Sequence, residues 1–455
     1  MPQAWFPPAC LPSAPGLPVP ADFFRRVPRH RYSLGTIGLF LHLVVWAACS
    51  GRATAVVLKE IAALLPGPEA TPCANTGRTW LLRVGLFELT CPKERAEDWV
   101  WLVDHTVQLG AHKGLIVVGL RLSVWQEAPR PLEHRDLRLL HLAPTERSDG
   151  EIVRAELKAV AAKTGVPRQI VSDGGSDLKR GIKLFREDHP DVAPTYDIKH
   201  KTALLLKHEL EKDEAWGKYV SQANLARRGL TLTPSAFLVP PGLKTQARYM
   251  NLDRLVRWGE DVLGYLDNPR DVPGGPIDPR LMEKRLGWLR EYRPQVAQWS
   301  ELLALTQASE HYVRHQGLHA QAVEELRPQL EPLATSDRGQ RMKDRLLGFV
   351  LQQAAPARAE ERLIGSTEVL ESLIGKYKRL QNAYSGGGMT AMLLSIGAIV
   401  GKPSLSTLHA ALETTTNREV GKWCREHLGI TLQSQRKTAF SRNENRSHPP
   451  PKPVR

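Results

Sequence analysis

Two short stretches decide the fold of this 455-residue chain: WVWLVDHT at residues 99–106 and QIVSDGGSDLK at residues 169–179. Each begins as a run of β-forming residues and then reaches an aspartate. A carboxylate inside an apolar strand is costly to bury, but a carboxylate at the end of a strand can face a cleft. In open α/β sheets, sites are built at the carboxyl ends of strands. We therefore predict a sheet in which Asp104 and Asp173 end neighbouring strands.

Strands and helices follow these stretches in a defined order. We expect strands at 115–120, 137–143 and 196–198, and helices at 149–163 and 177–187. Asp177 is a natural N-cap for the second helix. Three consecutive strands followed by helix, strand, helix and strand is the order of an RNase H-like fold, although other α/β domains share it.

The remaining chain divides by composition into further segments. Eight prolines precede residue 30, so we expect a flexible, basic, proline-rich arm over 1–34. Three short helices over 35–92 predict a helical DNA-binding domain of the helix-turn-helix kind, with Arg78 and Arg83 projecting from the third helix. The α/β core would occupy 95–202 and 361–435, interrupted by an α-helical insertion over 203–360 and followed by a basic, disordered tail over 436–455. A plain helical bundle would give the same pattern in 35–92.

The charge balance restricts the partners. A formal net charge of +14 favours a polyanion, nucleic acid first, although a basic enzyme without such a partner remains open. The five cysteines form no CxxC pair, which argues against a zinc site and for a reducing cytoplasm. No apolar run reaches the roughly 20 residues of a membrane-spanning helix, so we expect no membrane partner.

A third carboxylate belongs with the two aspartates. In STEVLESLIGKYK (366–378), Glu371 and Lys378 lie two helical turns apart and share a face. Asp104, Asp173 and Glu371 together would give the oxygen ligands that Mg²⁺ or Mn²⁺ prefers. Two such ions about 4 Å apart support phosphoryl transfer on a nucleic acid backbone. Lys378 would reach a phosphate. A solvated helix face is the alternative for Glu371 and Lys378.

Asp197 and His200 stand three residues apart in DIKH (197–200), at the end of the predicted last strand. His200 would position a carboxylate or touch the scissile phosphate, unless it is an ordinary surface histidine at the end of a strand.

The motifs VDHT (103–106), VSDGGSDLK (171–179), DIKH (197–200) and ESLIGKYK (371–378) together resemble the DDE transposases of bacterial insertion sequences. These enzymes belong to the retroviral-integrase superfamily, which has an RNase H-like core. The resemblance implies that Asp104, Asp173 and Glu371 are the catalytic, metal-binding triad. It also implies that Asp197 and His200 form a D-x-x-H element and that Lys378 completes a Glu-x6-Lys signature. Leu370 and Thr367 stand near the positions where the family usually has Tyr and Arg.

The long gap between Asp173 and Glu371 implies, within that superfamily, an α-helical insertion that helps to hold DNA. Trp258, Trp288 and Trp299 fall in it, either as core residues or as platforms for a flipped base.

These features predict a DNA transposase. It would bind the terminal inverted repeats of its element, hydrolyse the phosphodiester at each end and join the 3′-hydroxyl to target DNA, using two Mg²⁺ or Mn²⁺ ions. The resemblance implies a homodimer or higher assembly on double-stranded DNA, in the cytoplasm of a bacterium and associated with the nucleoid. Two alternatives remain: an RNase H-like nuclease without strand transfer, and a catalytically silent DNA-binding descendant.

Overall fold

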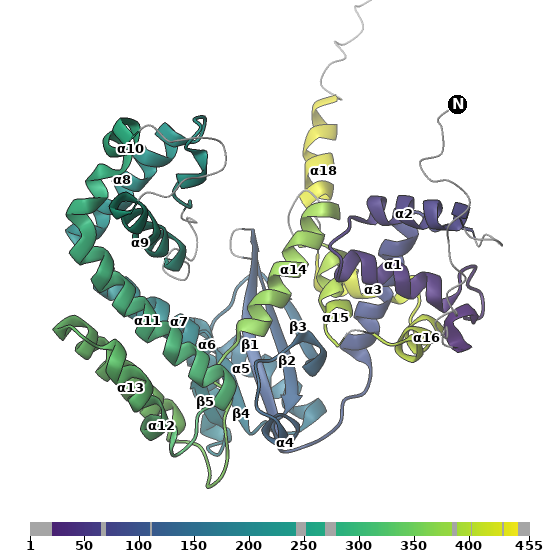
Figure 1. Cartoon of the computed structure of the whole chain (residues 1–455). Coiled ribbons are helices and arrows are strands. Elements are labelled where there is room, and N and C mark those ends of the chain that lie inside the picture. Colours follow the sequence, from purple (N-terminus) through teal and green to yellow (C-terminus); the bar gives the residue numbers. More distant parts are fainter. Residues whose placement is uncertain are drawn as a thin grey trace, which may run out of the picture.

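The computed structural model describes residues 21–64, 70–109, 112–242, 252–268, 279–384, 389–401, 403–429 and 432–444. A central sheet lies between a helical insertion on one side and a second group of helices on the other (Figure 1). Most of the predicted arm (1–20), the Gly386–Gly388 break and the end of the predicted tail (445–455) fall outside the described residues. Among the described helices, none is both long enough and apolar enough to cross a membrane.

The sheet has five strands in the order β3-β2-β1-β4-β5. Their bounds are β1 Trp99–Leu109, β2 His112–Arg121, β3 Arg138–Thr145, β4 Gln169–Ser172 and β5 Ala193–Tyr196. β1, β2 and β3 pair antiparallel, whereas β4 pairs parallel with both β1 and β5. The mixed α/β core expected from the sequence is therefore present, with its strands in the predicted chain order.

Two strand ends differ from the prediction. β1 does not end at Asp104 but continues to Leu109, because its antiparallel partner β2 also continues; Asp104 pairs with Ile116. β4 does end at Ser172, so Asp104 lies where β1 extends past its shorter neighbour. β5 ends at Tyr196, and Asp197 is the N-cap of the next helix rather than part of a strand.

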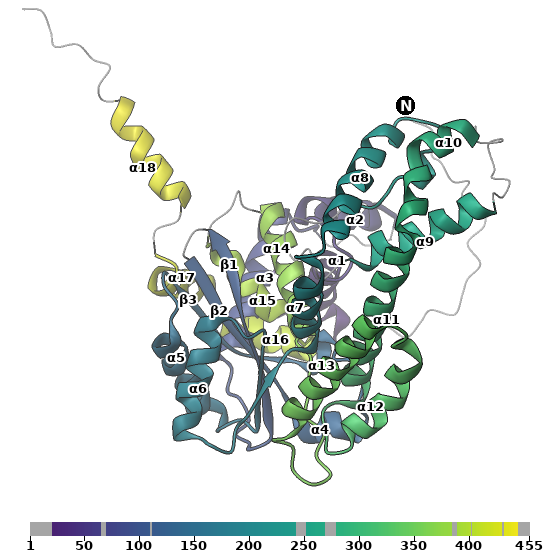
Figure 2. The same ribbon diagram turned by 90° about the vertical axis from the view of Figure 1, so that its left-hand side faces the viewer.

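One face of the sheet is covered by α5 (Gly150–Thr164) and α6 (Ser176–Asp188), as Figure 2 shows. Trp101 and Val103 alternate with residues of the opposite face, as the two-residue period of a strand requires, and share a core with Leu157 and Phe185. Gly175, not Asp177, is the N-cap of α6. The carboxylate of Asp177 instead accepts from Lys113 Nζ at 3.0 Å, a contact across the sheet edge that short-range sequence rules do not reveal.

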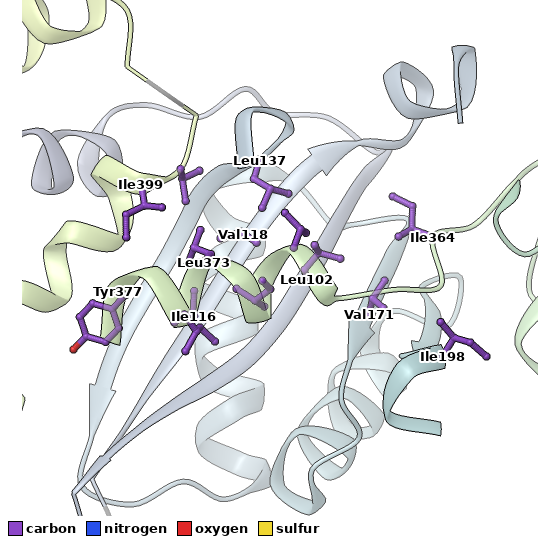
Figure 3. Packing of buried hydrophobic residues seen from close by; sticks show 14 of the residues in the cluster. Leu102, Ile116, Val118, Leu137, Val171, Ile198, Ile364, Leu373, Tyr377 and Ile399 are labelled. Carbon is purple, nitrogen blue, oxygen red and sulfur yellow. The ribbon is translucent and has the colours of Figure 1, made fainter. Parts of the chain in front are cut away.

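The opposite face carries α14 (Glu368–Tyr384). Its side chains Leu373 and Tyr377, one turn apart, lie against Leu102, Ile116 and Val118 of the sheet (Figure 3). Burying this apolar stripe fixes the helix on the sheet. Glu371, in the first turn of α14, is thereby held near the edge where Asp104 and Asp173 lie.

The insertion is helical, as predicted. Its helices are α7 Ile198–Leu210, α8 Glu214–Leu230, α9 Asp253–Asp267, α10 Pro279–Leu286, α11 Arg293–Gln316, α12 Ala322–Leu330 and α13 Asp337–Ala354, with 3-10 turns η3 Ala236–Leu238, η5 Gly287–Tyr292 and η6 Glu331–Leu333. Trp258 and Trp299 are buried, and each indole N–H is already engaged, by Leu238 O at 2.9 Å and Asp213 Oδ2 at 3.2 Å respectively. Trp288 is partly buried against the same core. The structure therefore favours the core role for these tryptophans.

The predicted N-terminal helices are present as α1 Leu34–Val45, α2 Gly51–Leu64 and α3 Ala74–Thr90, after a 3-10 turn η1 at Ala21–Phe24. They share a core with segments that follow α14: η7 Ala391–Leu394, α15 Ser395–Ile399, α16 Leu405–Thr414 and α17 Asn417–His427. We call this group the helical lobe. A Cβ on Gly85 would lie 1.8 Å from Leu394 O, so α3 approaches η7 closely because this position is glycine.

Two short helical elements, α4 Leu122–Glu127 and η2 His134–Asp136, connect β2 to β3. At the other end of the chain, α18 (Leu432–Glu444) extends away from the body (Figures 1 and 2). The prediction of a disordered tail from residue 436 is thus wrong for residues 436–444. Seven residues of this segment, from Lys437 to Asn443, contain neither proline nor glycine, and the prolines that prompted the prediction begin at Pro449.

Candidate active site

Asp104 and Asp173 lie on adjacent strands at one edge of the sheet. The parallel register pairs Val103 with Ser172, so the two aspartates are the next residues along β1 and after β4. Burial, followed by the negative charge of Asp173 and a smaller contribution from Glu371, raises the pKa of Asp104 to about 7. The predicted convergence of the two aspartates is therefore found, and it crowds like charges.

The loop after β4 requires a glycine at position 174. Gly174 has a φ of +76°, and a Cβ there would lie 2.3 Å from the ring of Tyr196. Gly175 N–H donates to Asp173 Oδ1 at 2.9 Å. The backbone thus turns sharply, and one of its amides orients the Asp173 carboxylate.

Glu371 reaches the same edge from α14 and is partly buried. Burial raises its pKa, and the charge of Asp197 adds to that effect. Its Oε1 atom is buried and, among the described residues, receives no hydrogen bond. The nearest cationic group is His200 Nδ1 at 3.5 Å. An acceptor left in this state is unusual in a folded protein and points to a missing ligand.

His200 and Asp197 form the second part of the site. Asp197 is fully buried and accepts from Lys199 N at 2.7 Å, from Thr367 N at 3.2 Å and from Thr367 Oγ1. His200 Nδ1 lies 3.3 Å from Asp197 Oδ2. Burial alone would lower the pKa of His200, but the Asp197 hydrogen bond and the surrounding carboxylates raise it to about 9. His200 is therefore a cation at neutral pH, positioned between Asp197 and Glu371.

Asp197, His200 and Glu371 are close enough to offer three ligand atoms to one ion. Asp197, however, is already saturated by hydrogen bonds, and a protonated His200 has no free lone pair on Nδ1. Asp104, Asp173 and Glu371 are acceptors only when ionised, which suits a divalent cation chemically. Among the described residues, however, the group whose three ligand atoms lie within 4.8 Å of one another is Asp197, His200 and Glu371, and Asp104 and Asp173 are not part of it.

Lys378 and Arg78 lie away from these carboxylates. Lys378 is exposed two turns further along α14. Arg78 is half-buried in α3, where its charge acts on Tyr384 and Cys424. Neither placement tests the phosphate-binding or DNA-binding role that the sequence suggested.

Arg83 does not project from α3, contrary to the prediction. Its guanidinium donates to the carbonyl oxygens of Thr415 and Leu412, and its Nη1 lies 3.1 Å from His30 Nε2. The side chain thus joins α3 to the end of α16 within the helical lobe. The helical spacing that suggested projection gave no information about α16, which packs against this face of α3.

Sequence reasoning missed a charged network behind Glu371. Glu368, one turn before Glu371, accepts from Lys199 Nζ at 3.1 Å and forms an ion pair with Arg314, whose Nε lies 3.0 Å from Glu368 Oε2. Arg314 also contacts Glu310 at 3.1 Å. Lys199 belongs to α7 and Arg314 to α11, so two helices of the insertion hold the first turn of α14. No sequence motif links these distant positions. The sequence showed only that Lys199 is adjacent to His200.

A further cluster flanks Asp104. Ser148 Oγ lies 3.0 Å from His105 Nε2, and His105 Nδ1 lies 3.7 Å from Asp177 Oδ2, which also contacts Lys113. Burial lowers the pKa of His105, whereas the pKa of Asp177 is lowered to about 2 by Ser148, Lys113 and His105 acting against its burial. This cluster holds β1, β2 and the start of α6 together beside the aspartates.

No protein-family model and no curated protein matches the sequence. Among solved structures, a match is found to the "Drosophila P element transposase strand transfer complex", with a TM-score of 0.42 and 10% sequence identity. It covers 84% of this chain and 94% of that chain. A likeness of this degree carries no functional argument, so the account of function rests on the site itself.

Proposed function

We propose that the chain is a DNA transposase with an RNase H-like core, whose site cuts phosphodiester bonds at the ends of its element and joins them to target DNA. One observation carries the proposal. Asp104 and Asp173 belong to adjacent parallel strand ends, the charges of Asp173 and Glu371 both act on Asp104, and a buried oxygen of Glu371 lacks a hydrogen-bond donor among the described residues. Such a set is suited to holding Mg²⁺ or Mn²⁺ rather than to stabilising the fold.

Asp104, Asp173 and Glu371 would hold the ions in this proposal. Bound there, divalent ions supply Lewis acidity to a phosphate and lower the pKa of an attacking hydroxyl. The residues of the chain itself would position these carboxylates. The Gly175 amide orients Asp173, the apolar stripe of α14 fixes Glu371 on the sheet, and Glu368 is held by Lys199 and Arg314.

His200 adds a positive charge to the site. Because its pKa is about 9, it is protonated at neutral pH and can donate a hydrogen bond to a phosphate oxygen where negative charge accumulates. Asp197, which is buried and saturated, orients the ring. Lys378, exposed on α14, would hold a phosphate further from the reacting bond, and two or more chains would assemble on paired DNA ends.

The test uses purified protein, labelled DNA carrying the ends of the chain's own element, a target plasmid and Mg²⁺ or Mn²⁺. We expect end cleavage and strand joining that are lost in Asp173→Ala. Cleavage without joining would instead establish a nuclease without strand transfer. End binding with neither product, equal in wild type and variant, would establish a catalytically silent descendant.

A further inference from the structure

A basic groove lies between α7 and α13, outside the carboxylate site. It encloses a volume of about 510 Å³ and is lined by Lys201, Leu205, His208, Glu209, Lys212 and Arg345. We call it the α7–α13 groove. Lys201, Leu205 and His208 follow one another along α7 at intervals of four and three positions, so they form a single stripe on one face of that helix, and Lys212 lies two residues beyond its end at Leu210.

The charges in the groove are predominantly positive. Glu209 is its acidic residue, and it is already paired with Arg338 Nε at 3.0 Å and with Arg345 Nη1 at 2.7 Å. Lys212 is exposed, and no ion pair is found for Lys201 or Lys212 within the described parts of the chain. The groove therefore presents cations that the protein itself does not neutralise, as a polyanion site requires.

The groove begins at the candidate active site. Lys201 follows His200 directly, and its ammonium lies 5.5 Å from the ring centre of Phe349. Phe349 packs edge-on against Tyr196 at 6.1 Å, and Tyr196 in turn occupies the space beside Gly174 in the Asp173 loop. Side-chain contacts therefore connect the near end of the groove to the catalytic loop.

From that end the stripe runs away from the sheet with α7, which leaves the end of β5 and enters the insertion (Figure 1). At about 1.5 Å of rise per residue, Lys201 and His208 are separated by about 10 Å along α7, and Lys212 follows in the turn after the helix. One strand of duplex DNA places about three phosphates over about 10 Å. The length and direction of the stripe thus match a strand that enters or leaves the site.

We propose that the α7–α13 groove binds the phosphate backbone of the DNA segment adjacent to the reacting bond. Lys201, Lys212 and Arg345 would contact successive phosphates, with Glu209 holding Arg345 in place. This inference rests on the proposed function, because it assigns the path of the same substrate. It concerns the affinity of the chain for DNA and not the cleavage or joining of DNA, so it can be tested without measuring the reaction.

The experiment measures the affinity of the full chain for a labelled DNA duplex of random sequence, and for one of its single strands, over a series of salt concentrations with Ca²⁺ in place of Mg²⁺. Lys201→Gln/Lys212→Gln removes two groove cations. We expect weaker binding and a salt slope reduced by about 2 in magnitude for the duplex. The matched control is Lys163→Gln/Lys183→Gln, which removes two exposed cations from α5 and α6 on the other face of the sheet.

An unchanged slope in the groove variant, or an equal reduction in the control, would overturn the groove proposal. A loss confined to the single strand would also overturn it as stated for duplex DNA. Asp173→Asn separates the two proposals: we expect it to retain duplex affinity while losing cleavage. Duplex affinity that depends on the groove in a protein without cleavage or joining would support the groove and count against the transposase chemistry.

Discussion

The insertion and the edge of the sheet both bury charged groups, but they do so in opposite ways. In the insertion, Arg338 contacts Glu209 and Asp213, each at 3.0 Å, so positive and negative charges match. At the sheet edge, the charges of Asp173 and Glu371 act on Asp104, and burial together with these charges raises the pKa of Asp104 to about 7. Matched charges hold helices together, whereas crowded like charges destabilise the metal-free protein and serve a ligand. The predictions below test this contrast.

The largest expected effect is on activity. Asp173→Asn should reduce metal-dependent DNA cleavage by more than about a hundredfold, since even residues one step removed from a metal commonly cost 10–100-fold. It should not lower the melting temperature of the metal-free protein, because it removes one of the crowded negative charges. Gel-based cleavage and calorimetry check the two halves. If Asp173→Asn were inactive because it does not fold, Asp173 would stabilise the protein, which would contradict the contrast between the sheet edge and the insertion.

The largest effect on stability should come from the insertion. Arg338→Met leaves Glu209 and Asp213 without this partner, and we expect a loss of about 2–3 kcal/mol in the free energy of unfolding. Arg345→Met is the control, since Arg345 is half-exposed and contacts Glu209 alone; its loss should stay within about 1 kcal/mol. Urea denaturation monitored by tryptophan fluorescence measures both. Equal losses would contradict the distinction between buried and exposed pairs.

A pH effect separates Asp104 from ordinary carboxylates. Its pKa in the folded, metal-free protein is about 7, against an ordinary value of 3.8, so the folded state binds a proton more tightly than the unfolded state. The contribution of protonated Asp104 to the free energy of unfolding is therefore present at low pH and is lost as pH rises from about 4 to about 7. In EDTA, the stability of Asp104→Asn relative to wild type should increase over that range. If the difference in stability between Asp104→Asn and wild type did not change with pH, the pKa of Asp104 would not be shifted in the folded protein.

The smallest expected effect is at Lys378. Because its side chain is exposed on α14, Lys378→Gln should leave the free energy of unfolding unchanged within about 0.5 kcal/mol. It should reduce the salt slope of DNA binding by about 1, as expected for one lost phosphate contact. Fluorescence anisotropy at several salt concentrations measures the slope. An unchanged slope would remove Lys378 from the DNA-binding surface.

The sequence predicted those parts of the fold that local chemistry determines. β4 was predicted with its observed bounds because an apolar run ends at Asp173 and two glycines. The adjacency of Asp104 and Asp173 followed from strand order, and the position of Glu371 near the start of a helix followed from the local sequence around it. These inferences needed only neighbouring residues, a known topology or a recognised motif.

Features set by distant partners were not predictable in this way. Asp104 lies inside β1 because β2 lengthens the ladder, and Arg83 is internal because α16 packs on its face of α3. Asp197 is an N-cap whose second oxygen is held by Thr367, far along the chain. The support of Glu368 by Arg314 likewise depends on how the insertion returns to the sheet.

The most direct test of the central claim is anomalous diffraction from crystals grown with Mn²⁺. The account predicts a peak in contact with the carboxylates of Asp104 and Asp173, with Glu371 at the same site, and loss of that peak in Asp173→Asn. A peak bound instead by Asp197 and His200, or none near the two aspartates, would contradict it.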